Sequence, residues 1–116
     1  MSVDAQIFAA LSPLAGGRVF PDVAPEGTAR PYLTYQQVGG GALNYLEGTV
    51  PGKRNARMQI NAWADSRLAA SELSEQAEDA LRLAPGLQAE VLGARASIFE
   101  EDTKLRGARQ DFSVWY

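Results

Sequence analysis

The last residues of the chain, DFSVWY, place large apolar or aromatic groups at four of the final five positions. A chain end usually frays unless the fold holds it in place. Because side chains alternate between the two faces of a strand, Phe112 and Val114 would share one face, and Ser113 and Trp115 the other. The ending therefore predicts a terminal strand that is an integral part of a sheet, with Phe112 and Val114 completing the core.

Four other segments have the composition of strands. The clearest are residues 32–38, YLTYQQV, and residues 56–64, ARMQINAWA, in which apolar and polar residues alternate. Residues 94–102, ARASIFEED, are expected to pair with the chain end as an antiparallel hairpin, with a turn near residues 103–107. Residues 18–20, RVF, are a candidate for a short strand.

Two segments show helical spacing. The first predicts a helix over residues 3–14, because apolar residues recur at Val3, Ile7, Leu11 and Leu14. The second helix begins at a cap formed by Asp65 or Ser66 and runs to about Ala84, before Pro85. Its expected apolar stripe consists of Leu68, Leu73, Ala77, Ala80, Leu81 and Ala84. Residues 1–116 are thus expected to form a single α+β domain, a mostly antiparallel sheet of four to five strands with two helices packed on it.

The composition argues against several classes of function. A net charge of −3 argues against binding a phosphate backbone, so sequence-specific recognition of nucleic acid is not expected. The chain has no cysteine and no histidine, which removes thiolate chemistry and the side chain most used for acid–base catalysis and transition-metal binding. No nucleophile and base stand in a recognisable arrangement, so we expect no enzyme, no cofactor and no metal site. The first residues resemble neither a signal peptide nor a membrane span, which predicts synthesis in the cytoplasm.

A long connection, GGGALNYLEGTVPGKRN at residues 39–55, separates the two clearest strands. Loops of this length inside a compact domain are usually functional or disordered. This loop is therefore the leading candidate for contact with a partner. Leu43 and Tyr45 are its candidate contact residues. The segment GTVPGKR within it resembles a phosphate-binding loop, but Gly48 and Gly52 are one residue too close, and a strand rather than a helix follows.

Two charged clusters are candidates for contacts between subunits. The basic cluster consists of Lys53, Arg54 and Arg57, and the acidic cluster of Glu100, Glu101 and Asp102. Adjacent strand residues point to opposite faces, so the acidic cluster does not converge easily on one cation. Each cluster can be a solvent-exposed surface, and the functional alternative is an ionic contact between the basic cluster of one subunit and the acidic cluster of the next.

Trp63 is the aromatic residue that departs from its strand's pattern, because it lies on the polar side of the alternation. Aromatic residues on strands are more often packing groups than ligand platforms. Trp63 is nevertheless retained as a candidate contact residue for a partner.

Three passages together resemble the tail completion, or head–tail joining, proteins of phages and prophages. They are VFPDVAPEGTARPYLTY, the strand ARMQINAWA with the helix after it, and the closing DFSVWY. The resemblance implies a structural subunit, similar to tail terminators, that caps the tail tube as a ring, commonly six-fold, and helps to join it to the head. It also implies contacts with the tail tube protein and head–tail connector proteins, a place in the neck of the virion, and no catalytic residues. A monomer in isolation is compatible with it, and the alternative is a non-enzymatic cytosolic binding module such as a chaperone or inhibitor.

Overall fold

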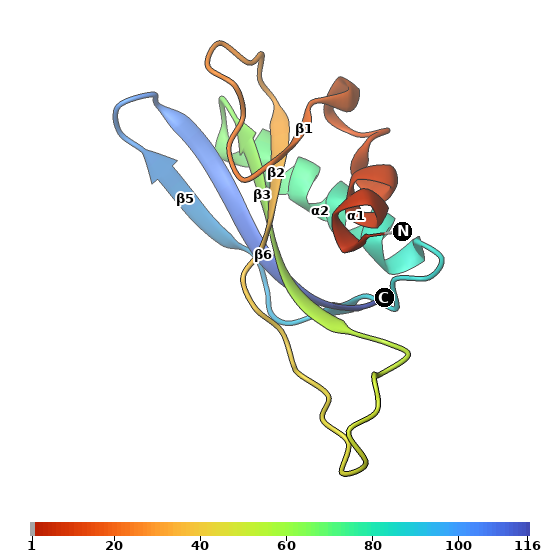
Figure 1. The fold of residues 1–116 in the computed structure, drawn as a ribbon. Helices are drawn as coiled ribbons and strands as arrows, with labels where there is room; N and C mark the ends of the chain where they lie inside the picture. The colour runs from red at the N-terminus through yellow and green to blue at the C-terminus, as the bar shows by residue number, and fades with distance from the viewer. Residues whose placement is uncertain (1) are drawn as a thin grey trace.

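The computed structural model describes residues 2–116 as two α-helices on one side of a single sheet (Figure 1). The helices are α1, Val3–Leu11, and α2, Arg67–Leu83, and a short 3-10 turn, Ala15–Gly17, follows α1. The strands are β1 (Val19–Pro21), β2 (Tyr32–Gln37), β3 (Asn55–Ala64), β4 (Glu90–Val91), β5 (Ala96–Glu100) and β6 (Leu105–Trp115). The α+β class is confirmed.

The sheet has six strands in the order β1-β2-β3-β6-β4, with β5 also paired to β6. This is one more strand than the sequence predicted, because β4 is two residues long and too short to leave a pattern. β1 runs parallel to β2, and every other pair is antiparallel. β3 and β6 form the spine, since their ladder runs without interruption from the pair Asn55 and Trp115 to the pair Ala64 and Arg106. β6 pairs on its other edge with β5 along its first half and with β4 near its end.

The core lies between the helices and one face of this sheet. β3 and β6 supply alternate residues to it, among them Ala56, Met58, Ile60, Ala62, Ala108, Phe112 and Val114. Ile7 and Leu11 of α1 and Leu73 and Leu81 of α2 close it from the helix side. The opposite face of the sheet carries no helix (Figure 1). We call it the open face.

The structure confirms that the chain end is part of the sheet. Phe112 and Val114 are 1% and 0% exposed, and they lie on the core face. Beyond the last strand, the backbone N–H of Tyr116 donates to the carbonyl of Arg54 at 2.9 Å, and the N–H of Arg54 donates back at 2.8 Å. Trp115 is half-buried, and its N–H donates to the carbonyl of Leu87 at 2.8 Å. The terminal residues are therefore tied down on both edges.

The first helix ends earlier than predicted, at Leu11 instead of Leu14. Pro13 has no N–H to continue the helix, and the hydroxyl of Ser12 donates to the Ala9 carbonyl at 3.3 Å. At the other end the cap is Ser2, whose hydroxyl oxygen accepts from the N–H of Ala5.

The second helix begins after Ser66, which was one of the two predicted caps. The prediction for Leu68 was wrong, because this side chain is 69% exposed. The buried stripe is instead Ala70, Leu73, Ser74, Ala77 and Leu81. Successive residues of a helix are rotated by about 100°, so Leu68 points about 200° away from Ala70.

The hairpin between β5 and β6 is confirmed, but its turn was predicted too late in the chain. It occupies residues 101–104, and β6 already begins at Leu105. Gly107, expected in the turn, lies inside the strand opposite Trp63.

Candidate interaction site

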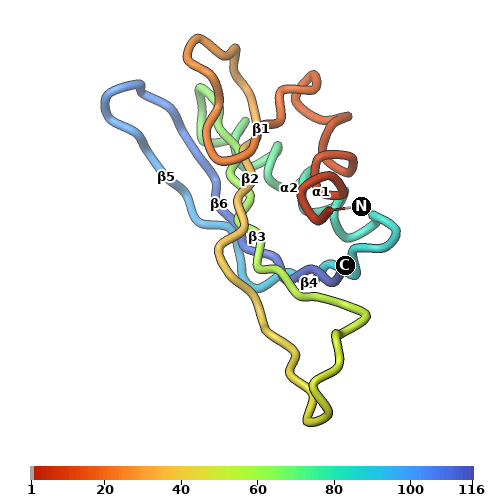
Figure 2. The backbone as a smooth tube through the Cα atoms, in the orientation of Figure 1, coloured from red at the N-terminus to blue at the C-terminus, as the bar shows by residue number. Residues whose placement is uncertain are grey.

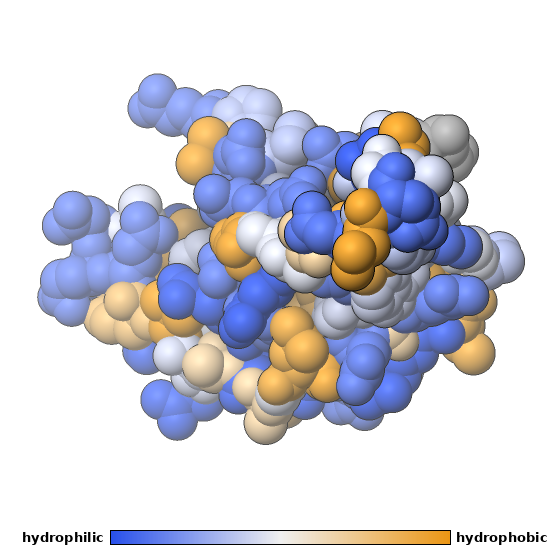
Figure 3. Space-filling view, turned by 60° about the horizontal axis from the view of Figure 1, so that its bottom comes forward, coloured by the Kyte–Doolittle hydropathy of each residue, from blue (hydrophilic) through white to orange (hydrophobic). Residues whose placement is uncertain are grey.

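Residues 38–54, between β2 and β3, form an arm that extends away from the sheet (Figures 1 and 2). The molecule is elongated, with extents of 52 × 24 × 24 Å. Leu46 is fully exposed and Val50 is 78% exposed, while the predicted contact residues Leu43 and Tyr45 are 38% and 46% exposed. On the side toward which the arm points, apolar groups stand out among hydrophilic ones (Figure 3). The arm thus presents apolar side chains without cover from the described part of the chain.

The base of the arm is fixed although its tip is free. The N–H of Val38 donates to the carbonyl of Arg57, and the N–H of Arg57 donates to the carbonyl of Gly39, both at 2.8 Å. Gly40 then packs against the start of β3 with φ +147°, and a Cβ there would lie 2.5 Å from the carbonyl oxygen of Asn55. Only glycine fits this approach. The fixed base sets the direction in which the arm leaves the sheet.

Two cations of the predicted basic cluster lie exposed at this base. Lys53 and Arg54 form no ion pair with any residue of the described chain. The third member, Arg57, is on the open face and already pairs with Asp111 at 2.8 Å. The structure therefore separates the predicted cluster into two unpaired cations and one paired cation.

The predicted acidic cluster is at the opposite end of the β3–β6 ladder, where Glu100 ends β5 and Glu101 and Asp102 begin the turn of the β5–β6 hairpin. Glu101 pairs with Lys104 at 2.9 Å within this turn. Glu100 and Asp102 form no ion pair within the described residues. Unpaired charges of opposite sign therefore lie at the two ends of an elongated subunit.

Trp63 is half-buried on the open face, where two neighbours fix its indole ring. Its Nε1–H donates to the hydroxyl oxygen of Thr34 at 3.2 Å. The ring also covers Gly107, since a Cβ at that position would lie 2.8 Å from Cζ3 of Trp63. A glycine in a strand interior often marks such a close approach. The indole is thus held in one orientation by its surroundings.

A cleft of about 260 Å³ lies beside this indole. Its lining consists of Asp22, Val23, Ala24, Tyr32, Thr34, Asn61, Trp63 and Glu100. The Oδ1 atom of Asn61 is buried and has no hydrogen-bond partner. Burial raises the pKa of the Tyr32 hydroxyl, and the negative charge of Glu100 raises it further. We call this hollow the Trp63 cleft.

The sequence indicated only part of this cleft. Trp63 and Glu100 were predicted as contact residues, and the structure brings them to the same hollow. Asp22, Tyr32 and Asn61 were missed, because they come from three separate segments. The sequence signal that indicated this cleft was Trp63, an aromatic residue on the polar side of the alternation in β3.

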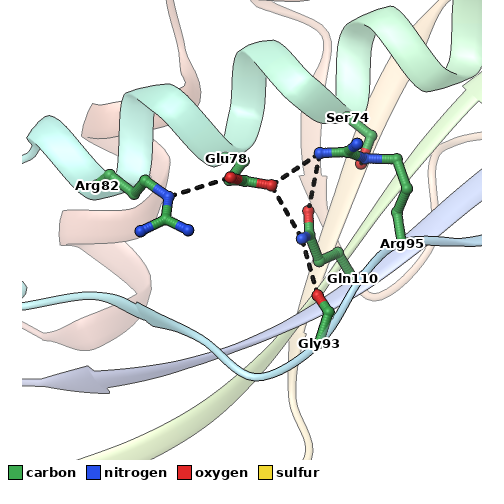
Figure 4. Close-up of polar contacts among 6 residues, drawn as sticks. All are labelled: Ser74, Glu78, Arg82, Gly93, Arg95 and Gln110. Atoms are coloured by element: carbon green, nitrogen blue, oxygen red, sulfur yellow. Dashed lines mark hydrogen bonds and ion pairs between the residues drawn. The ribbon is translucent and has the colours of Figure 1, made fainter.

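A polar network joins α2 to β6 on the helix side of the sheet (Figure 4). The buried amide of Gln110 donates to the carboxylate of Glu78 and to the carbonyl of Gly93, both at 3.0 Å. Arg95 donates to Glu78 at 2.8 Å and to the hydroxyl of Ser74 at 3.1 Å. These bonds hold the segment between β4 and β5 against the helix.

Glu78 is the centre of this network, with a further ion pair to Arg82 at 3.0 Å. The hydrogen bond from Gln110 is the largest cause that holds the pKa of Glu78 below its usual value, while partial burial opposes this effect. The charges of Arg82 and Arg95 lower the pKa further. Each side chain of the network is bonded to at least one other member, which is typical of a structural role.

Among residues 2–116 there is no group of three or more acidic side chains that could hold a metal ion. Nor does any described helix have the length and hydropathy to cross a membrane.

The sequence of residues 5–116 matches the family described as tail completion protein gp17. The chain belongs to this family. It is therefore a structural protein of the phage tail, in agreement with the resemblance seen in the sequence. The comparison with curated proteins gives no significant match.

The fold of this family member also occurs in a solved structure, described as the virion of a native gene transfer agent particle. That chain superposes with a TM-score of 0.62 at 17% sequence identity, and the match covers 98% of this chain and 93% of the other. At this identity the likeness establishes a shared fold.

Proposed function

We propose that this chain caps the end of the tail tube as a subunit of a ring, commonly six-fold, and helps to join the tail to the head. In this role its partners are the tail tube protein, head–tail connector proteins and further copies of itself. It is made in the cytoplasm of the bacterial host, acts in the neck of the virion and catalyses no reaction. The proposal rests on membership of the tail completion family.

The observation that best supports a ring is that unpaired basic and unpaired acidic side chains lie at opposite ends of the subunit. Lys53 and Arg54 lie at one end of the β3–β6 ladder, and Glu100 and Asp102 lie at the other. A head-to-tail contact between two different patches generates a closed ring when the rotation per subunit closes. Complementary charges guide such an association and fix its register more than they add raw affinity.

The arm supplies the apolar part of the contact. Exposed Leu46 and Val50 have no cover within the described chain, and burying one such side chain stabilises a contact by roughly 1.5–3 kcal/mol. The fixed base at Gly40 limits the entropy lost when the arm docks. The tail tube and the neighbouring subunit are both candidate surfaces for it.

The test is electron microscopy of particles assembled with and without this protein. Without it, we expect tails with unfinished ends that do not attach to heads, and supplying the full-length chain restores attachment. Reversing the charge of Lys53 and Arg54 together is expected to abolish the rescue, and the paired reversal of Glu100 and Asp102 to restore part of it. Normal tails and normal attachment in the absence of the protein would contradict the proposal and favour the cytosolic binding module.

A further inference from the structure

The side chains that line the Trp63 cleft suit the binding of a guanidinium group. The indole of Trp63 is held in place by Thr34 and by the close approach of Gly107. Cations bind over the face of an aromatic ring, and tryptophan binds them best. An arginine adds planar stacking and a bidentate contact to a carboxylate, which lysine does not provide.

Two carboxylates line the cleft without a cation of the described chain bonded to either of them. Asp22 and Glu100 both line it, and neither forms an ion pair within the described residues. The nearby cation of Arg30 is bonded to Asp65 at 2.8 Å and to the carbonyl of Thr103 at 2.9 Å. In addition, the buried Oδ1 of Asn61 in the wall has no donor. An unsatisfied buried acceptor is uncommon and costs stability, so a donor from outside would be favoured here.

Arg54 has the properties expected of a side chain that binds in such a site: a fixed backbone, an exposed side chain and no ion pair within the described residues. Its backbone is bonded in both directions to Tyr116, which fixes where its side chain begins. The side chain is exposed and has no ion pair with the described residues. Lys53 beside it is equally exposed. It therefore serves as a matched control with the same charge but a different head group.

We propose that the Trp63 cleft of one copy receives the guanidinium of Arg54 from the neighbouring copy, stacked on the indole and paired with Asp22 and Glu100. The contact is between copies, because Arg54 and Trp63 of one chain are nine residues apart along an extended strand, about 30 Å. When every subunit makes this contact with the next, the subunits associate head to tail. The inference rests on the proposed ring and names the contact that builds it.

The absence of cysteine makes cross-linking a direct test. Gly52→Cys and Val23→Cys place single thiols two residues before Arg54 and on the rim of the cleft, and they leave Arg54, Trp63, Asp22 and Glu100 unchanged. With a short bismaleimide, the full-length double variant is expected to give a ladder of covalent oligomers. Asp79→Cys in place of Val23→Cys is the control, since Asp79 is also exposed but lies on α2.

Arg54→Ala in the cross-linking background is expected to reduce the yield of oligomers at least tenfold. The matched control is the background with Lys53→Ala, which removes the same charge and is expected to lower the yield much less than Arg54→Ala. A second control is Leu83→Ala, an exposed site on α2, where less than a twofold change is expected. Arg54→Glu with Glu100→Arg is expected to recover a large part of the yield. The emission of Trp63, measured in Trp115→Phe protein, is expected to shift to the blue on assembly and to remain unshifted with Arg54→Ala.

Two results are decisive and separable. If rings form on tails but neither the cross-link nor the emission of Trp63 responds to Arg54→Ala, this contact is wrong while the proposed function stands. If tails end and attach normally without the protein, the proposed function is wrong, and the contact between copies is wrong with it.

Discussion

β6 and the arm both carry large apolar side chains, and the fold buries those of β6 while leaving those of the arm exposed. In β6, Ala108, Phe112 and Val114 lie an even number of positions apart, so they reach the core face together. In the arm, Leu43, Tyr45, Leu46 and Val50 follow no such period and find no facing element. Burial therefore depends on the spacing of apolar residues and on a partner surface as well as on their number.

The largest effect is expected from removing the end of β6. A chain truncated after Asp111 is expected not to fold, because it loses Phe112 and Val114 from the core together with the edge that holds β4. Phe112→Ala alone is expected to cost about 3–5 kcal/mol from lost burial and a cavity. Urea denaturation measures both.

The matched comparison removes residues 43–51 from the arm instead. These residues contribute no core side chain, and shortening a loop changes its closure entropy only slightly. We expect the urea midpoint to stay close to that of the intact protein. If the chain truncated after Asp111 melts cooperatively at the full-length midpoint, the end of β6 is not needed for folding.

The next largest effect is expected at the junction between the two regions. Gly40→Ala places a Cβ 2.5 Å from the carbonyl oxygen of Asn55 at φ +147°, which we expect to destabilise the fold by about 1–3 kcal/mol. Gly52→Ala is the control, because no atom lies within 4 Å of the added carbon. Thermal unfolding of the two variants tests this, and equal midpoints would mean that the base of the arm is not fixed.

The polar network gives a smaller effect that depends on pH. The folded pKa of Glu78 lies below its unfolded value near 4.5, so the stabilisation is present above about pH 4.5 and is lost as pH falls through the lower folded pKa. Glu78→Gln is expected to cost about 1–2 kcal/mol at pH 7 and to reduce the loss of stability in acid. Denaturation midpoints from pH 7 to pH 3 measure it. Exposed Glu75→Gln should retain the acid dependence of the intact protein.

The smallest effect on stability is expected in the arm itself. Leu46 is fully exposed, so Leu46→Ser should change the free energy of unfolding by less than about 0.5 kcal/mol. Attachment of heads to tails should nevertheless fall if the arm docks on a neighbour. A loss of stability as large as that of Phe112→Ala would show that the arm packs on its own chain.

The sequence predicted the elements whose apolar residues repeat with a clear period. β3, β6 and α2 were placed within a few residues, and the pairing of β5 with β6 followed from their proximity in the chain. The prediction was wrong for Leu68 because an apolar residue on the solvent side of a helix cannot be told from one at the edge of its stripe. β4 was missed because it consists of two residues.

The sequence by itself determined the α+β class, the core face of the terminal strand and the absence of histidine and cysteine chemistry. Each of these depends on residue type or on spacing along a single element. Only the tertiary structure decided that Arg57 pairs with Asp111 and that Glu100 lies beside Trp63 in one cleft. Those contacts join residues far apart in the chain, so they depend on strand order and register, which local periodicity does not specify.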